Sequence, residues 1–297
     1  MNVFEKWRRL QPQRGEGLPF KLNFDWNKGK PPSPRGEGTG VGRAPFAALL
    51  LLFALPFAYL LLLSLAMQWR FPLLLPEGLS LEHWQLAWRI GGLADSLGLS
   101  AVCAAVVALS STALGFRMAH AIAAHHRRRL LVAIAYLPYA FSPVIYAFCL
   151  QFFFLKTNLA GTLAGVLLGQ FLLVFPFSVI LFVNHWTPRL RNMEALVYTL
   201  GGSAGAAWRR VLLPVSRPAL LNGLFQTFLL AWFEYGLTTV LGQGRVPTLP
   251  VRVYQYIGEA NPYFAALGST LLIWPPLLLL WLNYRYQNRT HAAFADR

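Results

Sequence analysis

Long apolar runs separated by short polar segments constrain the fold of this 297-residue chain more than any other feature. Each run holds about 20 residues or more, the length that an α-helix needs to cross roughly 30 Å of hydrocarbon. A segment in lipid must pair its own backbone groups, which favours helices. The sequence therefore predicts an all-α membrane protein with six transmembrane helices: Ala44–Met67, Ser96–Ile122, Leu130–Leu155, Gly161–Val183, Ala219–Leu241 and Tyr263–Asn283.

The distribution of charge predicts how these helices are oriented. Only 12% of the residues are charged, about half the share of a soluble protein, and the net charge is +15. Of the 26 Lys and Arg residues, 21 fall in the two terminal segments, around Arg127–Arg129, and in the island between the fourth and fifth runs. Positive residues favour the cytoplasmic side, so both termini and the island are expected in the cytoplasm. This arrangement excludes a nucleic-acid partner and favours contact with membrane lipid.

The chain divides into three predicted parts. Residues 1–43 form a polar tail rich in Gly and Pro, without the apolar core of a signal peptide, and are expected to be flexible and cytoplasmic. Residues 44–286 form the six-span domain. Residues 287–297 form a second short cytoplasmic tail.

Chemistry-bearing motifs are sparse. Cys103 and Cys149 lie inside apolar runs and fit packing positions, and His120, His125 and His126 stand beside arginines, a poor setting for a metal ion. The G-x-S-x-G pattern at Gly201–Gly205 lacks the strand-to-helix setting of a hydrolase nucleophile. No catalytic, cofactor-binding or metal site is therefore predicted in this chain.

Glycines in the fourth run fall at Gly161, Gly165 and Gly169, a spacing that places them on one helical face. Such a face permits close helix approach, either within the bundle or against a second subunit.

The polar island between the fourth and fifth runs, Asn184–Arg217, has a pattern of its own. Glu194–Leu200 and Ala204–Leu213 are predicted to be two short helices, because glycines between them permit a chain reversal. Pro214 and Pro218 are expected to end the second helix before the fifth span. A short helix-turn-helix at a membrane surface suits contact with a partner in the water.

The island resembles the EAA loop of binding-protein-dependent ABC transporter permeases. In that family a Leu-Gly pair precedes a hydrophobic-X-Leu-Pro ending, whose proline follows the glycine by thirteen residues, and here Leu200-Gly201 and Leu213-Pro214 stand at this spacing. The family's glutamate falls on Ala195, whereas Glu194 stands one residue earlier, about 100° away around a helix. Residues 188–214 would then be the coupling helix region that docks on an ATPase. The docking residues implied by the resemblance are Glu194, Ala195, Leu200, Gly201, Gly202, Ser203, Ala204, Gly205, Trp208, Arg209, Arg210, Leu213 and Pro214.

Glu234 is the one acidic residue within the fifth apolar run. A carboxylate at membrane depth is costly unless it faces a wet cavity or a partner, which makes it a candidate for the translocation pathway. Pairing with a neighbouring helix and a position facing interfacial water are the alternatives. Helical spacing places Thr227 and Leu230, and more loosely Gln226, on the same face.

The block from Phe233 to Tyr254 adds to the resemblance through Phe233-Glu234-Tyr235-Gly236, Leu241-Gly242 and Thr248-Leu249-Pro250-Val251. Its form is most similar to the branch that imports iron, thiamine, sulfate, molybdate or polyamines. The resemblance implies the MetI-like fold of type I ABC importer permeases, with both ends inside. It implies an inner-membrane subunit that forms the path for a small solute. The implied partners are ABC ATPase subunits carrying ATP and Mg, a second permease of the same or a sister chain, and a periplasmic solute-binding protein.

A secondary transporter or channel driven by an ion gradient is the alternative. Such carriers usually show internal repeats and several intramembrane charges. The sequence shows no clear repeat, and Glu234 is nearly alone in the spans. The ABC permease is therefore the favoured interpretation.

Overall fold

The computed structural model describes residues 43–67, 69, 76–89 and 92–295. The chain divides into two compact units, residues 1–51 and 52–297. In the first unit the described residues are 43–51, the beginning of α2 (Arg43–Leu65). The predicted tail, apart from its last residue, lies outside the described residues.

The described part of the chain is almost entirely helical, as predicted. Three helices are long and apolar enough to cross a membrane: α4 (Leu93–Ala124), α7 (Leu163–Val183) and α13 (Pro262–Ala295), the last over its residues up to Arg285. Two further candidate spans are bent pairs of helices, which brings the total to between three and five. The six straight helices of the prediction are therefore only partly reproduced.

The third predicted span, Leu130–Leu155, is not one straight helix. It consists of α5 (Arg128–Tyr136), the 3₁₀ turn η1 (Leu137–Ala140) and α6 (Pro143–Lys156), with a bend of 95°. Ser142 stands before Pro143 and is extended, at φ −60° and ψ 141°. The ring of a proline disfavours the helical conformation of the preceding residue, so this dipeptide starts a new helix.

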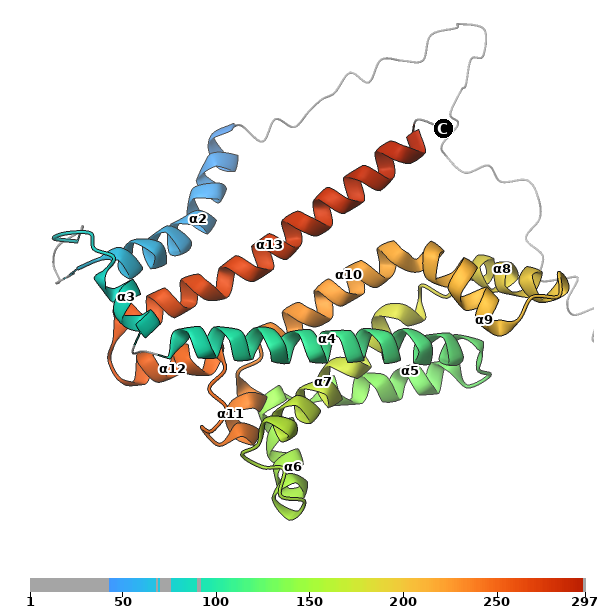
Figure 1. The fold of residues 1–297 in the computed structure, drawn as a ribbon, viewed down its shortest axis with the longest axis horizontal. Helices are drawn as coiled ribbons and strands as arrows, with labels where there is room; N and C mark the ends of the chain where they lie inside the picture. Colours follow the sequence, from blue (N-terminus) through green and yellow to red (C-terminus); the bar gives the residue numbers. More distant parts are fainter. Residues whose placement is uncertain (1–42, 68, 70–75, 90–91, 296–297) are drawn as a thin grey trace, which may run out of the picture. The chain divides into compact units, whose positions relative to one another are not determined.

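Helix α4 is the centre of packing in the second unit, lying along α7 and α10 (Leu213–Trp232), as Figure 1 shows. Small residues permit the close approach. A Cβ on Gly115 of α4 would lie 2.2 Å from Ser178 Oγ of α7, and a Cβ on Gly223 of α10 would lie 2.2 Å from Cζ of Phe182. Larger residues at these two glycines would push the helices apart.

The three glycines of the fourth run make separate contacts. Gly161 precedes α7 and has φ +72°, while a Cβ on Gly165 would meet the carbonyl oxygen of Leu159. Gly169 packs against Leu237 and Leu241 of α11 (Gly236–Gly242). The contacts of all three glycines are within the chain. They do not form one face, because Gly161 lies in the turn before the helix, outside the helical repeat. On the opposite side from the island, α3 (Glu82–Arg89) and α12 (Leu249–Gly258) both pack against α13 and α4.

The polar island folds into α8 (Pro188–Thr199), a turn, α9 (Ala204–Ala206) and the π-helical turn η2 (Ala207–Leu212), which continues into α10. The predicted stop at Pro214 and Pro218 is wrong, since the helix runs from Ala204 to Trp232 without a break. Pro214 stands in the first turn after η2, where the Leu213 N–H already reaches back five residues to the Trp208 carbonyl. A proline is tolerated at a place where the regular backbone hydrogen bonding over four residues is already interrupted.

Candidate functional site

The turn after α8 is built on two glycines. Gly201 has φ +79°, a conformation that only glycine adopts without strain. Its N–H donates to the Tyr198 carbonyl at 3.0 Å, and the Gly202 N–H donates to the Val197 carbonyl at 2.8 Å. These two bonds form a Schellman motif, which pairs the last carbonyls of the helix. Ser203 then accepts from the Ala206 N–H at 3.3 Å and caps α9.

The tip of this segment exposes apolar side chains. Leu200 is 80% exposed and Leu196, one helical turn earlier, is 59% exposed. Exposed leucines next to a polar turn are typical of a surface that a partner covers. The other predicted docking residues on the exposed side are Ala195, Gly201, Ser203, Ala204, Gly205, Arg209, Arg210 and Leu213, whereas Gly202, Trp208 and Pro214 are half-buried.

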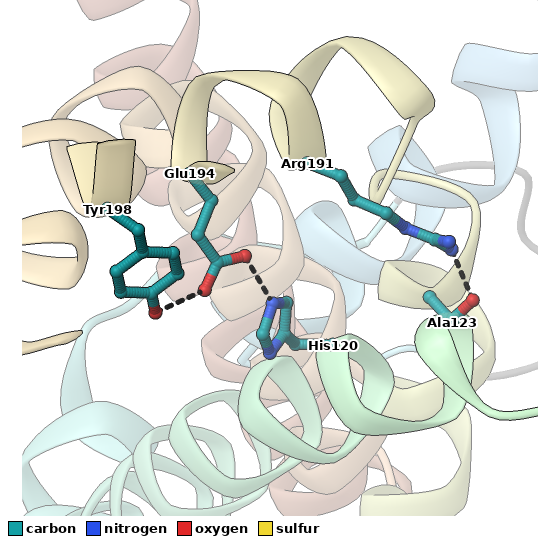
Figure 2. A network of polar contacts seen from close by, with 5 residues as sticks. All are labelled: His120, Ala123, Arg191, Glu194 and Tyr198. Carbon is teal, nitrogen blue, oxygen red and sulfur yellow. Dashed lines mark hydrogen bonds and ion pairs between the residues drawn. The ribbon is translucent and has the colours of Figure 1, made fainter. Parts of the chain in front are cut away.

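Glu194 points toward α4, as Figure 2 shows. Its Oε2 accepts from His120 Nε2 at 2.9 Å, and its Oε1 accepts from the Tyr198 hydroxyl at 3.1 Å. The side chains of His120 and Glu194 are 25% and 13% exposed. The Glu194 carboxylate is thus bound within its own chain.

Arg191 makes a second contact between the same two helices. Its guanidinium donates to the carbonyl of Ala123, in the last turn of α4 (Figure 2). The final carbonyls of a helix lack partners within it, and an arginine there supplies both a donor and a favourable charge.

An aromatic cluster fixes the π turn to the same end of α4. Trp208 of η2 lies with its ring centroid 5.3 Å from His120 and 5.8 Å from Trp186. Trp186 precedes α8, is 2% exposed and lies 4.5 Å from His120. Aromatic pairs at these separations contribute about 0.5–1.5 kcal/mol beyond area burial. Residues on both sides of α8 are therefore packed on one imidazole, that of His120.

A cavity of about 740 Å³ lies between α4 and the beginning of the helix that starts at Ala204. Its walls combine the arginines Arg117 and Arg209 with the ring of Trp208 and aliphatic side chains of α10. The guanidinium of Arg117 lies 5.7 Å from the centroid of the Trp208 ring. The exposed end of the cavity is thus basic, and its inner wall is apolar.

Glu234 stands at a break in the fifth predicted span rather than within a helix. Helix α10 ends at Trp232 and α11 begins at Gly236, bent by 56°. The Glu234 carboxylate accepts from the Leu237 N–H at 2.8 Å, and from the N–H and the hydroxyl of Thr238 at 2.9 Å each. The side chain is 8% exposed. These bonds satisfy the first amides of α11, which would otherwise have no partner.

The four predicted pathway residues do not share one face. Gln226, Leu230 and Glu234 border one cavity of about 660 Å³, together with apolar residues of α6 and α7. Thr227 is buried elsewhere, with its hydroxyl 2.9 Å from that of Thr112 on α4. Thr227 does not border that cavity, because α10 ends at Trp232 and helical spacing does not extend to Glu234.

Sequence reasoning missed two contributors, His120 and Arg191, which hold α8 against α4. Beside Glu234, the amide of Gln170 donates to the Thr238 hydroxyl at 2.8 Å. The signal for His120 was the shifted glutamate, because a carboxylate turned away from the usual face needs another partner. Nothing in the local sequence identified that partner, 74 positions away.

Comparisons with known proteins give a consistent result. No protein-family model matches the chain. The 2-aminoethylphosphonate transport system permease protein PhnV of Salmonella typhimurium, described as putative, is 28% identical over 264 residues, covering 86% of this chain and 97% of the relative. The molybdenum transport system permease protein ModB of Mycobacterium tuberculosis is 27% identical over 207 residues, covering 64% and 78%. A probable sulfate transport system permease protein of Nephroselmis olivacea is 31% identical over 136 residues, covering 44% and 47%.

The fold has a solved counterpart. A chain of a bacterial ABC transporter that imports the acidic polysaccharide alginate superposes with a TM-score of 0.61 at 16% identity, covering 83% of this chain and 94% of that one. Relatives at nearly full length, a shared helical fold and several apolar membrane helices agree with one another. This chain is an inner-membrane transport subunit, not an enzyme, and the relatives that it resembles over most of its length are permeases of ABC importers.

Proposed function

We propose that residues 188–214 dock on a cytoplasmic ATPase and transmit its movement to the membrane helices. Permeases of ABC importers work with ATPases and a solute-binding protein. The observation that carries this assignment is the exposed apolar tip at Leu196 and Leu200, held on a base of aromatic packing and hydrogen bonds around His120. A tip on a rigid base transmits displacement, whereas a flexible loop would absorb it.

The chemistry of the tip indicates what its seat on the ATPase is like. Glu194 is the only acidic residue between positions 188 and 217, and its carboxylate is directed to His120. Arg209 and Arg210 are exposed in the π turn η2 of the same segment. A cleft with an apolar floor and acidic side chains at its rim would complement both features.

The finer topology belongs to the same proposal. Six spans with both termini in the cytoplasm place the docking segment on the ATPase side, and the distribution of Lys and Arg supports this orientation. The first span would be α2, and the two bent helix pairs would be the third and fifth spans. A second permease, identical or a sister chain, would complete the pathway.

The transport cycle follows from these positions. Closure of two ATPases on ATP draws the two docking segments together, and α4 and α10 move with them because they pack on the same segment. The pathway then opens outward to receive solute from the external binding protein, and hydrolysis resets it. Each state must differ in its contacts for ATP to shift the equilibrium between them. Gln226, Leu230 and Glu234, which border one cavity, remain our candidates for the pathway lining.

Copurification tests the docking assignment. The tagged chain is co-expressed with an ABC ATPase from the same genome that copurifies with the wild type. Leu200→Asp is compared with Leu81→Asp, a control leucine that is 61% exposed on the opposite side of the predicted membrane. We expect Leu200→Asp to lose most of the copurified ATPase while membrane insertion continues. Full retention of ATPase by this variant would contradict the docking assignment.

Reconstitution in vesicles tests the transport assignment. Uptake driven by ATP, and not by a proton or sodium gradient, is the expected result. The solutes named for the relatives, 2-aminoethylphosphonate, molybdenum and sulfate, form the first panel. Uptake by the permease alone under an ion gradient would favour the secondary carrier.

A further inference from the structure

Two contacts join α8 to the last turns of α4 with matching spacing. His120 and Ala123 are three residues apart on α4, and their partners Glu194 and Arg191 are three residues apart on α8. The earlier residue of one helix pairs with the later residue of the other, so the two helices run antiparallel here. Residues three apart lie on one face of a helix. The contacts therefore form a two-point attachment between facing surfaces (Figure 2).

His120 has a special place in this attachment because it contacts α8, the π turn η2 and Trp186 before α8. It bonds to Glu194 on α8, and its ring packs against Trp186 before α8 and against Trp208 in the π turn. The ring itself belongs to α4, the helix that packs along both α7 and α10. One side chain thus links the segment that an ATPase would move with the helix at the centre of the bundle.

We propose that His120 is a positioning residue for energy coupling, which fixes the docking segment to α4 through Glu194 so that both move as one body. This inference rests on the proposed function, since it requires the segment to receive force from an ATPase. It assigns Glu194 a contact within the permease instead of a charge offered to the ATPase. The position of Glu194, one residue before that of the family's glutamate, is what turns its carboxylate toward His120.

Partial burial gives the pair its strength. Exposed ion pairs contribute little, because water screens them and long side chains lose entropy when they are fixed. The Glu194 carboxylate is 13% exposed and accepts a second hydrogen bond from Tyr198, and the imidazole is held between two indole rings. Removing either partner leaves the other with an unmet hydrogen-bonding group at a half-buried site.

The test measures the coupling ratio, defined as solute molecules transported per ATP hydrolysed by the complete reconstituted importer. The variants are His120→Ala, Glu194→Ala and the double variant, with His126→Ala as the matched control. His126 is an exposed histidine at the same end of α4, with its ring on His125. We expect each single variant to lower the coupling ratio about fivefold or more while the ATPase stays bound and active. The control should keep the wild-type ratio.

The double variant separates a shared contact from two independent defects. If the two side chains act through each other, the double variant loses no more than either single variant, whereas independent losses multiply. His120→Gln, which keeps an N–H donor toward Glu194, should recover part of the ratio, and the exchange of His120→Glu with Glu194→His should recover part as well. Multiplicative losses, or wild-type coupling in both single variants, would overturn the proposal.

Hydrogen exchange on the purified permease provides a readout that does not need the ATPase. Amides of α8 should exchange faster in His120→Ala than in the wild type, with α7 unchanged. Unchanged protection of α8 would also count against the attachment. The Leu200→Asp experiment keeps the two proposals apart. If Leu200→Asp releases the ATPase but the His120 variants remain fully coupled, docking stands and the role of His120 falls.

Discussion

Glu194 and Glu234 are both bound within the chain, but in opposite ways. Glu194 is partly exposed and pairs with a residue 74 positions away on another helix. Glu234 is nearly buried and bonds to amides three and four positions ahead of it. In parts of the protein that water reaches, a carboxylate can hold two helices together, because the carboxylate and its partner both keep some of their hydration. At membrane depth, the carboxylate is stabilised by the nearest free amides.

The comparison predicts its largest effect at the break before α11. Glu234→Ala removes the acceptor of the Leu237 and Thr238 amides, and unmet buried donors cost about 1–3 kcal/mol each. We expect a loss of about 2–4 kcal/mol in the free energy of unfolding, with faster amide exchange in α11. Thermal unfolding in detergent, with Glu259→Ala as an exposed acidic control, measures this.

The glutamine variant separates a capping role of Glu234 from a role in the pathway. Glu234→Gln keeps one acceptor oxygen, so its loss of stability should be smaller than that of the alanine variant. If Glu234→Ala and Glu234→Gln were both as stable as the wild type, the carboxylate would have no capping role. Altered solute uptake at unchanged stability in Glu234→Gln would instead support the pathway role.

A smaller effect is expected at the turn of the docking segment. Gly201→Val forces a branched residue to φ +79°, which costs about 1–2 kcal/mol, although no atom lies within 4 Å of the added Cβ. The exposed turn should rearrange while the bundle remains folded. We expect ATP hydrolysis to continue and uptake to fall several-fold. Unchanged uptake in this variant would show that the turn geometry is dispensable.

The smallest effect concerns pH. His185 follows α7 and lies with its Nε2 2.8 Å from Ser216 Oγ, and burial lowers the pKa of its imidazole. The unfolded chain then takes up a proton more readily than the folded one, so stability falls as pH drops below about 6.5. Melting temperatures between pH 7.5 and 5.5 should decline more in the wild type than in His185→Gln. Equal slopes would contradict this role for His185.

The sequence predicted the composition of the bundle better than the course of its helices. The apolar runs around α4 and α7 are long and uninterrupted, so hydrophobicity alone located them. The bends before Pro143 and after Phe233 were missed, because an apolar run keeps the same composition through a bend. Pro143, which disfavours a helical conformation of the residue before it, and Gly236 are the sequence signals that could have indicated them.

The spacing from Gly201 to Pro214 predicted the docking segment, whose docking role stays a prediction, and the positive φ of Gly201 agrees with the expected turn. Its attachment to α4 was not predictable. The Glu194–His120 contact depends on how α8 crosses α4, and local sequence carries no information about that crossing. The continuation into α10 was also missed, because Pro214 was interpreted as a helix stop, although it falls in the first turn after the π turn.

The π turn between Ala207 and Leu212 has a mechanical consequence. From Ala204 to Trp232 the chain is one continuous helix, which starts in the docking segment and ends just before Glu234, where the chain bends. Single π turns inside α-helices are rare and frequently occur at functional sites. If an ATPase moves the docking segment as proposed, the packing of Trp208 against His120 ties the π turn to α4, and the straight part of the helix beyond the turn would carry the displacement toward Glu234.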